Sequence, residues 1–451
     1  LSTAEQLVPG FTPTGADSVA AREVKGSEEM VTILKRAVQA YETVPDSSVT
    51  LTIDGVPIEA TPAMIKAART RARRSRRPHN QARPHFAEHL TQSLAEALAH
   101  RIGTDPLGGK NLLSDADIDQ LHDDLADEPQ VQALIDDHFP ELDPVDVLEE
   151  LLTSEEAIAD VARDYDDYTR AALYRAPGEP FSPADTALVD ELAVLIGTVD
   201  PEEQRRKEEA EWRELVEEAE DALDILSSSE STDNDDDQFE AEILSAADVI
   251  DAETLAARQR VTDNRSTAQR ARADQTWAYG HVIVDEAQEL SPMEWRMVFR
   301  RCPSRWMTLV GDTAQTSSPA GVDDWTMALE PFVGKRFRLH ELTVNYRTPK
   351  EIADYAAEIL AQIDPDATAP TAIRSTGVPV AVLPSGAEIV EKRDGLSAVI
   401  DVDNVATMKG LEFDHVTVVD PGKIVEASPQ GWQDLYVAVT RATQTLTVIG
   451  E

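Results

Sequence analysis

A short apolar run that ends on two adjacent carboxylates constrains this chain more than any other stretch. Val282, Ile283 and Val284 are followed directly by Asp285 and Glu286. A β-branched run of this length predicts a strand buried on both faces of a parallel sheet. Ligands of such sheets bind beyond the carboxyl ends of the strands, where paired acids suit a hydrated Mg²⁺ and a water beside a nucleotide phosphate. A strand followed by an ordinary polar turn is the alternative, and the residues downstream decide between the two.

Net charge restricts the partners of the chain. Its 451 residues include 85 Asp and Glu against 41 Lys and Arg, which gives a net charge of −44, and 41% of them are hydrophobic. The hydrophobic fraction is adequate for folded cores, and the length allows about two to four domains. A surface this acidic repels nucleic-acid phosphate as a whole. Any role on DNA therefore needs a local basic patch, or the partner is itself basic.

The cysteine content and the ends of the sequence indicate the cellular compartment and whether the sequence is part of a longer protein. A single cysteine, Cys302, excludes an internal disulfide framework and favours a reducing cytoplasm. Within the sequence we find neither a signal peptide nor an apolar run of membrane-spanning length. The sequence begins at Leu1 and ends directly after a strand-like run at 445–449, so we expect it to be part of a longer protein.

The first quarter of the chain predicts helices, a hairpin and a basic segment. Residues 1–20 are predicted to be irregular, and apolar spacing predicts a helical pattern over 19–41. Asp54-Gly55 between two β-rich runs is a strong hairpin signal, and Thr61-Pro62 predicts the start of another helix. That helix ends in the basic cluster Lys66, Arg69, Arg71, Arg73, Arg74, Arg76 and Arg77. A phosphate-binding or partner-binding patch and a basic face paired with the acid-rich remainder are equally good interpretations.

Residues 100–240 predict helices and an acidic loop. Helix starts are indicated by capping residues at Ser114, Asp143-Pro144, Thr153-Ser154 and Ser182-Pro183, without convincing strands over 100–200. A charged amphipathic helix is predicted over 202–226 and a returning helix over 240–271. Between them, 227–238 lacks any apolar residue and is predicted to be disordered when free. It is a solvated linker or an acidic finger that enters a basic or Mg²⁺-bearing channel, with a tip formed by Asp233, Asp235, Asp236 and Asp237.

Further blocks of the same kind follow the first acid pair. A second buried strand is predicted over 306–310, and it leads into Gly311-Asp312 and Gln315. A strand over 339–346 ends on Asn345-Tyr346-Arg347. Lys409-Gly410-Leu411-Glu412 precedes a strand over 416–419, and the run from Leu435 to Arg441 is predicted to open the last helix before the final strand. Gln315 suits the positioning of a hydrolytic water, and we expect Asp312 to lie close to the first carboxylates.

In this order, the five blocks resemble motifs II to VI of superfamily 1 helicases of the UvrD/Rep type. The resemblance covers 282–442 and implies RecA-like motor domains with parallel sheets, ATP as substrate and Mg²⁺ as cofactor. It implies that Asp285 coordinates Mg²⁺, that Glu286 is the general base for water attack, and that Gln315 contacts the γ-phosphate or the water. Arg347 and Arg441 would be arginine fingers. The nucleotide-binding residues would be Glu412, Lys409, Gly410, Gly311, Asp312 and Tyr346.

Two departures from that family pattern are visible. The family places a Gly-x-x-x-x-Gly-Lys-Thr phosphate loop before motif II, and this sequence has none. We expect the loop to precede Leu1 in the complete protein; the alternative is a motor that has lost it. Rep-like enzymes also insert a large subdomain between motifs IV and V, where this chain has only residues 348–408.

A helical insertion ahead of motif II, an acidic finger and a short second motor domain together resemble the HelD proteins of Gram-positive bacteria, in particular the actinobacterial branch. That resemblance implies a helicase-like ATPase that binds RNA polymerase, opens its clamp and releases nucleic acid to recycle the enzyme. The channels of RNA polymerase are basic, so they are electrostatically complementary to an acidic protein that binds there. The alternatives are a UvrD/Rep-like DNA helicase or translocase in repair and a non-enzymatic polymerase-binding protein.

The same resemblance divides the chain. Residues 1–20 would be the remainder of the first RecA-like domain, 21–200 a helical clamp-opening insertion, and 201–272 a helical protrusion that carries the acidic loop. Residues 273–335 would complete the first RecA-like domain, and 336–451 would form the second.

Overall fold

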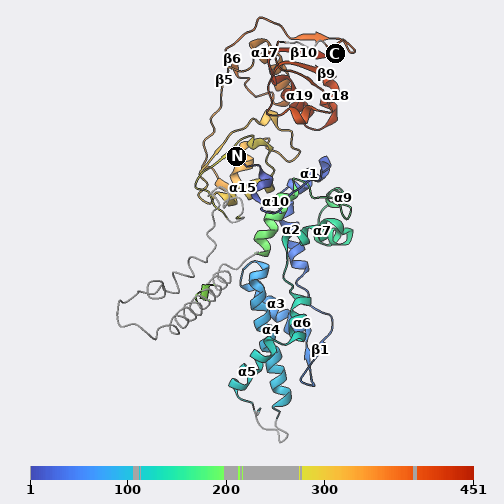
Figure 1. The fold of residues 1–451 in the computed structure, drawn as a ribbon, viewed down its shortest axis with the longest axis vertical. Helices are drawn as coiled ribbons and strands as arrows, with labels where there is room; N and C mark the ends of the chain where they lie inside the picture. The colour runs from blue at the N-terminus through green and yellow to red at the C-terminus, as the bar shows by residue number, and fades with distance from the viewer. Residues whose placement is uncertain are drawn as a thin grey trace, which may run out of the picture. The chain divides into compact units, whose positions relative to one another are not determined.

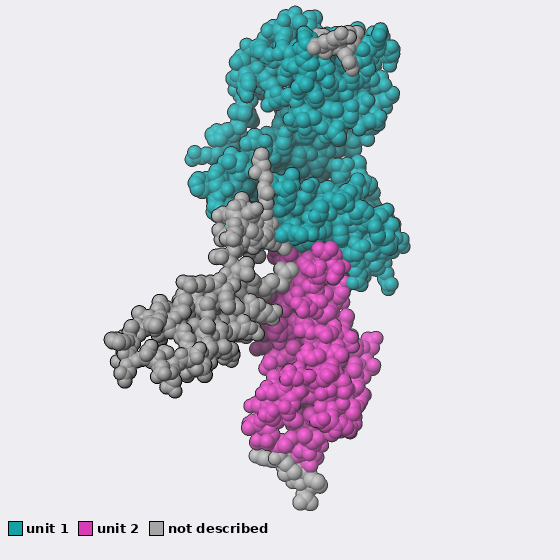
Figure 2. Space-filling model, viewed as in Figure 1, with its two compact units in different colours: residues 1–37, 148–192, 274–451 teal, residues 38–147, 193–273 magenta. Residues whose placement is uncertain are grey.

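The computed structural model describes residues 2–104, 111, 113–197, 212, 213, 216, 274, 277–389 and 394–450. Its chain forms two compact units, each assembled from separate stretches of sequence (Figures 1 and 2). Unit 1 comprises 1–37, 148–192 and 274–451, and unit 2 comprises 38–147 and 193–273. Of the predicted helix over 202–226, the structure describes only residues 212, 213 and 216, which are helical. The predicted helix over 240–271 and the acidic loop with Asp233, Asp235, Asp236 and Asp237 lie outside the described residues. None of the described helices is long and apolar enough to cross a membrane.

Unit 2 is built on a hairpin and a pair of packed helices. Its elements are β1 (Val49–Ile53), β2 (Val56–Ala60), α3 (Pro62–Arg74), α4 (His79–Ile102), α5 (Asp115–Ala126) and α6 (Pro129–His138). The antiparallel register pairs Ile53 with Val56, which confirms the turn predicted at Asp54-Gly55. Thr61 accepts a hydrogen bond from the Met64 amide at the start of α3, and Ser114 forms a capping box with Asp117 on α5, as their sequences predict.

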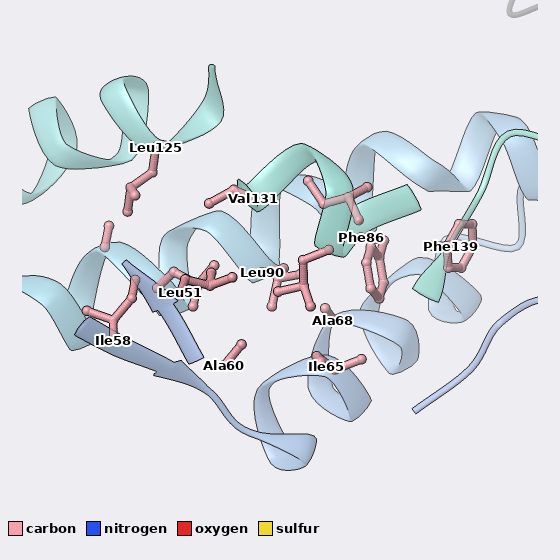
Figure 3. Close-up of a cluster of buried hydrophobic side chains, with 14 of the residues drawn as sticks. Leu51, Ile58, Ala60, Ile65, Ala68, Phe86, Leu90, Leu125, Val131 and Phe139 are labelled. Atoms are coloured by element: carbon pink, nitrogen blue, oxygen red, sulfur yellow. The ribbon is translucent and has the colours of Figure 1, made fainter. Parts of the chain in front are cut away.

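The core of unit 2 lies between α3, α4, α6 and the hairpin (Figure 3). Phe86 and Leu90 of α4 are fully buried there, together with Ile65 and Ala68 of α3. Phe139 stacks on Phe86 with ring centroids 5.0 Å apart. These apolar contacts make the unit a folded body with its own interior, and they fix which face of α3 remains in solvent.

The chain enters unit 1 through short helices. These are η1 (Ala4–Leu7), α1 (Val19–Gly26), α2 (Glu29–Ala40), α7 (Pro144–Thr153), α8 (Glu155–Val161), α9 (Asp167–Leu173) and α10 (Asp185–Ile196), of which α2, α7 and α10 cross a unit boundary. The helical pattern predicted over 19–41 is confirmed, as the two helices α1 and α2. Ser27 ends α1 because its amide and its hydroxyl both donate to the Val24 carbonyl, at 3.1 and 2.8 Å. The helix starts predicted at Pro144 and Ser154 are confirmed, and α10 begins two residues after Pro183.

Two parallel strands carry the first acid pair. The elements of this region are β3 (Val282–Val284), η2 (Ala287–Glu289), α15 (Pro292–Arg301), β4 (Met307–Leu309), η3 (Thr313–Gln315) and α16 (Trp325–Val333). Val284 pairs with Leu309. The prediction that both strands are buried on both faces is wrong, since Ile283 is 70% exposed and Trp306 is 68% exposed. One face of the pair packs on Trp295 of α15 and its neighbours, while no described element covers the other.

An all-parallel sheet forms the C-terminal part of unit 1 (Figure 1). Its strand order is β7-β10-β9-β8, and it packs with helices on a shared apolar core. The elements are β5 (Val344–Asn345), α17 (Lys350–Ile363), β6 (Thr371–Ala372), β7 (Ala381–Leu383), β8 (Ser397–Ile400), η4 (Val405–Met408), β9 (Phe413–Val419), α18 (Pro421–Ala427), α19 (Gly431–Thr440) and β10 (Ala442–Ile449). The expected α/β class with parallel strands is confirmed here.

Two predicted boundaries in this region are wrong. The strand expected over 339–346 is reduced to β5, because only Val344 and Asn345 find a partner strand, and Leu342 is 87% exposed. Leu435 lies in the middle of α19 instead of opening it, because the helix begins at Gly431. Arg441 is therefore the C-cap residue of that helix, with its backbone fixed directly before β10.

Candidate nucleotide-hydrolysis site

The first acid pair lies where β3 ends, beside the end of β4. Because the two strands are parallel and in register, Asp285 and Gly311 leave the sheet at the same edge. Both Asp285 and Glu286 are exposed. The amide of Glu286 donates to Oδ1 of Asp285 at 3.0 Å. This edge thus presents two carboxylates to solvent at the position where parallel sheets bind ligands.

Glu286 has an unusual backbone conformation. Its φ of 52° and ψ of 39° lie in the left-handed region, which costs a non-glycine residue of order 1–3 kcal/mol. Such conformations persist where the surrounding structure holds them. Here the Ala287 amide donates to the Val310 carbonyl at 2.9 Å directly after the turn. The turn thereby redirects the chain from β3 into η2 and leaves the Glu286 carboxylate at the strand end.

Gln288 connects the first acid pair to the second block. It is fully buried; its Nε2 donates to Oε2 of Glu286 at 2.8 Å, and its Oε1 accepts the Asp312 amide at 3.0 Å. A Cβ on Gly311 would lie 2.4 Å from the same Oε1, so only glycine fits beside Gln288. Sequence reasoning assigned no role to Gln288. Its place two residues after Glu286 was the available signal, but a buried amide cannot be told from an exposed one by sequence.

Asp312, Gln315 and Arg441 continue this chain of hydrogen bonds. Asp312 accepts the Ala314 amide on Oδ1 at 3.0 Å and Nε2 of Gln315 on Oδ2 at 2.8 Å. Oε1 of Gln315 in turn accepts Nη2 of Arg441 at 2.7 Å. Arg441 also donates from Nε to the Val437 carbonyl at 3.2 Å. A continuous path thus runs from Glu286 through Gln288, Asp312 and Gln315 to the guanidinium at the end of α19.

Burial sets the electrostatics of this end of the path. Burial lowers the pKa of Arg441 below its ordinary value, and the charge of Arg347 acts in the same direction. The carboxylates of Glu286, Glu412 and Asp312 oppose that shift. Burial also raises the pKa of Tyr436 to about 12, with the Asp312 charge adding to it. The site therefore combines the buried guanidinium of Arg441 with nearby carboxylates. A guanidinium can stabilise the negative charge of a phosphate group, and carboxylates can bind the metal ion that accompanies it.

Lys409 and Gly410 lie on the loop that leads into β9. The Lys409 ammonium donates to the Glu289 carboxylate and to the Gln315 carbonyl, and its Nζ lies 3.4 Å from Ser317 Oγ. Gly410 has a φ of +74°, in the left-handed region. Lys409 therefore fixes η2 and η3 against the loop that leads into β9. This structural contact is additional to the nucleotide role that the resemblance implies.

Arg347, Glu412 and Tyr346 are displayed at the surface. Nε of Arg347 lies 3.0 Å from Oε1 of Glu412, and both side chains are about half exposed. Tyr346 is 75% exposed. The charge of Arg347 is close enough to lower the pKa of Arg441. The side chain of Arg347 nevertheless pairs with Glu412 and, among the residues that the structure describes, makes no hydrogen bond to the path that ends at Arg441.

The carboxylate edge suits a magnesium ion. Mg²⁺ is held in such sites by one or two carboxylates together with substrate phosphates and waters, not by a cage of protein ligands. Among the described residues there is no group of three or more His, Cys, Asp or Glu placed to hold a metal. Asp285, exposed where β3 ends, has the donor chemistry that the first arrangement requires. The residues present therefore fit the ion.

Comparison with known families agrees with this architecture. Residues 239–450 match the family described as the viral superfamily 1 RNA helicase core domain. That span is a little under half of the chain and includes every residue from Asp285 to Arg441 described above. The match supports a superfamily 1 helicase-like protein and implies a RecA-like fold for this region. It also indicates a motor driven by nucleoside triphosphates that acts on nucleic acid. No curated protein matches the chain.

Proposed function

We propose that Asp285, Glu286, Gln315 and Arg441 belong to the ATP-hydrolysing site of a helicase-like enzyme. The observation that carries the proposal is the hydrogen-bonded path from Glu286 to Arg441, which joins the acid pair to a buried guanidinium. In phosphoryl transfer the protein positions a water and stabilises charge on the γ-phosphoryl group, so acids and guanidiniums are needed at one place. This path supplies both.

Each residue has a defined task in this proposal. Glu286 takes the proton of the attacking water, and Gln315 orients that water or contacts the γ-phosphate. Asp285 would hold Mg²⁺, which would neutralise phosphate charge. Arg441 stabilises the charge that develops during transfer. Its present hydrogen bond to Gln315 means that nucleotide binding and the orientation of the Gln315 amide are coupled, since one guanidinium serves both.

We further propose that the complete protein binds bacterial RNA polymerase, opens its clamp and releases nucleic acid to recycle the enzyme. The charge of the chain supports this partner over DNA tracking. A net charge of −44 and an aromatic content of 5% are unfavourable for a translocase, which needs basic grooves with stacking aromatic side chains. Polymerase channels are basic because they hold nucleic acid, so electrostatic complementarity favours an acidic protein there.

Two measurements on the purified full-length protein test this function. ATP hydrolysis should be stimulated little by single-stranded DNA, and the protein should copurify with RNA polymerase. Strong stimulation together with strand unwinding would support the second candidate, a UvrD/Rep-like DNA helicase in repair. The helicase-core match agrees with a nucleic-acid motor in general. Copurification with RNA polymerase without any ATP hydrolysis would instead support the third candidate, a non-enzymatic polymerase-binding protein.

The acidic segment has a separate test. Neutralising Asp233, Asp235, Asp236 and Asp237 to asparagine should weaken displacement of nucleic acid from polymerase and leave ATP turnover intact. These residues are far in sequence from the path between Glu286 and Arg441. Equal loss of both activities, or of neither, would contradict a role of this segment in the polymerase.

A further inference from the structure

The basic segment of unit 2 is displayed to solvent. Ile65, Ala68 and Ala72 turn one face of α3 into the core, as Figure 3 shows for Ile65 and Ala68. The spacing of these three residues leaves the opposite arc of the helix outside. Along that arc and just beyond it are exposed basic side chains, namely Lys66, Arg71, Arg74 and Arg76. We define these four residues as the basic surface of α3.

Carboxylates of the described residues do not neutralise this surface. Arg73 pairs with Glu42, and Arg69 donates to the Glu42 carbonyl at 2.9 Å, so these two are engaged by the protein. None of the four basic side chains takes part in an ion pair or hydrogen bond in the part of the chain that the structure describes, although the Lys66 carbonyl accepts the Thr70 hydroxyl at 2.7 Å. Elsewhere the same chain pairs its arginines readily, for example Arg36 with Asp164 and Arg83 with Asp136.

Folding does not account for this concentration of charge. Basic side chains in the last turn of a helix are favoured by its dipole, and Arg71 and Arg74 lie there. Lys66 lies in the second turn, too far from the C-terminal end of the helix to gain from that interaction. Like charges also crowd one another: burial lowers the pKa of Arg69, and the charge of Arg73 lowers it further. An unpaired cluster of this kind, in a chain of net charge −44, is retained at a cost to stability.

The surroundings of the surface identify its ligand. Over residues 49–101, all of which the structure describes, no large apolar side chain is exposed. These residues therefore offer no large exposed aromatic or aliphatic side chain on which a base could stack or an apolar partner could dock. Several guanidiniums, in contrast, can contact successive phosphates. We propose that the basic surface of α3 binds the phosphodiester backbone of a nucleic-acid duplex, without reading its sequence.

This binding is separate from ATP hydrolysis, because α3 belongs to unit 2 and the path from Glu286 to Arg441 belongs to unit 1. The test uses the full-length protein with Lys66→Gln, Arg71→Gln and Arg74→Gln combined, changes that keep good helix formers. A matched control replaces three exposed basic residues of other elements, Lys35, Arg101 and Lys335, by glutamine. Both variants lose the same charge, so a general electrostatic effect cancels between them.

Binding of fluorescent duplexes, one of DNA and one of RNA, is measured without nucleotide between about 50 and 200 mM KCl. The triple variant should lower the slope of log affinity against log salt by roughly 3, since each lost phosphate contact removes roughly 0.9. Its affinity at low salt should fall by roughly two orders of magnitude. The control should keep the wild-type slope, and both variants should hydrolyse ATP as the wild type does.

Three results would overturn the proposal. The first is an unchanged slope in the triple variant with both duplexes. The second is an equal fall in the control, which would indicate overall charge. The third is competition by polyglutamate as effective as competition by duplex at equal charge, which would assign the surface to an acidic protein. A slope change with the DNA duplex, the RNA duplex or both supports it and identifies the source of the phosphates.

Discussion

Nη2 of Arg441 lies 2.7 Å from Oε1 of Gln315, and this hydrogen bond joins the C-cap of α19 to the turn that follows β4. The two residues are 126 positions apart in the sequence. Their contact connects the β3-β4 sheet with the four-stranded sheet through groups that suit phosphoryl transfer.

Replacing Arg441 by lysine should impair ATP hydrolysis. Arg441→Lys keeps a positive charge but cannot donate to Gln315 and to the Val437 carbonyl in the same planar geometry. We expect the ATPase kcat of the full-length protein to fall by about 10³-fold or more, the range observed for arginine fingers. The exposed Arg338→Lys change serves as a control and should leave kcat unchanged. Wild-type turnover in Arg441→Lys would exclude the proposed role.

Gln288 should be needed for stability as well as for the site. Gln288→Met keeps a similar volume but removes the acceptor of the Asp312 amide and the donor to Glu286. Because the residue is fully buried, leaving these groups unsatisfied should lower the free energy of unfolding by about 1–3 kcal/mol. Urea denaturation measures this loss. The exposed Gln39→Met change should stay within about 0.5 kcal/mol of the wild type, and an equal effect of the two changes would contradict the bridge.

The ion pairs between α10 and α15 stabilise unit 1. Asp190 is 1% exposed and lies 2.7 Å from Nη2 of Arg301 and 2.6 Å from Nη2 of Arg300. Asp190→Asn leaves the buried Arg301 without its charge partner and leaves Arg300 paired with Glu191 alone, which should cost about 3–5 kcal/mol in chemical denaturation. Asp160→Asn, in an exposed pair with Arg163, should cost less than about 1 kcal/mol. An equal loss of unfolding free energy in the two variants would show that burial of the Asp190 ion pairs does not add to stability.

Glu191 should make this contact sensitive to acid. Burial alone would raise its pKa, but the hydrogen bonds and charges of Arg296 and Arg300 outweigh burial and hold the pKa below its ordinary 4.5. A depressed carboxyl pKa contributes stability above the unfolded value, and that stability is lost as pH falls through the folded value. Stability should therefore decline more steeply below about pH 4.5 in the wild type than in Glu191→Gln. Parallel pH profiles of the two proteins would refute this.

Local signals in the sequence predicted much of this structure. Asp54-Gly55, Thr61-Pro62 and Ser114 determine their turn and caps through neighbouring residues, so their positions could be inferred without a fold. The acid pair at the end of β3 also followed from a short β-branched run. The ranges 202–226, 227–238 and 240–271 stay predictions, as do the assigned domains and the roles of the site residues.

What the sequence could not supply depends on tertiary contacts. Whether residues 339–343 form a strand depends on a partner, and the short pairing with β6 reaches only Val344. The exposure of Ile283 depends on which elements cover β3, a property that apolar character does not encode. The bridging role of Gln288 depends in the same way on the approach of Gly311 from the neighbouring strand. Long-range packing decided each of these outcomes.

The central claim is that Glu286 activates water in an ATP-hydrolysing site. Single-turnover ATP hydrolysis by the full-length protein, compared with Glu286→Gln, tests it most directly. Loss of the general base should slow hydrolysis by about 10²- to 10⁴-fold while ATP binding, measured with a fluorescent nucleotide, remains within about twofold. Hydrolysis at the wild-type rate in Glu286→Gln, or no hydrolysis by the wild-type protein, would contradict the account.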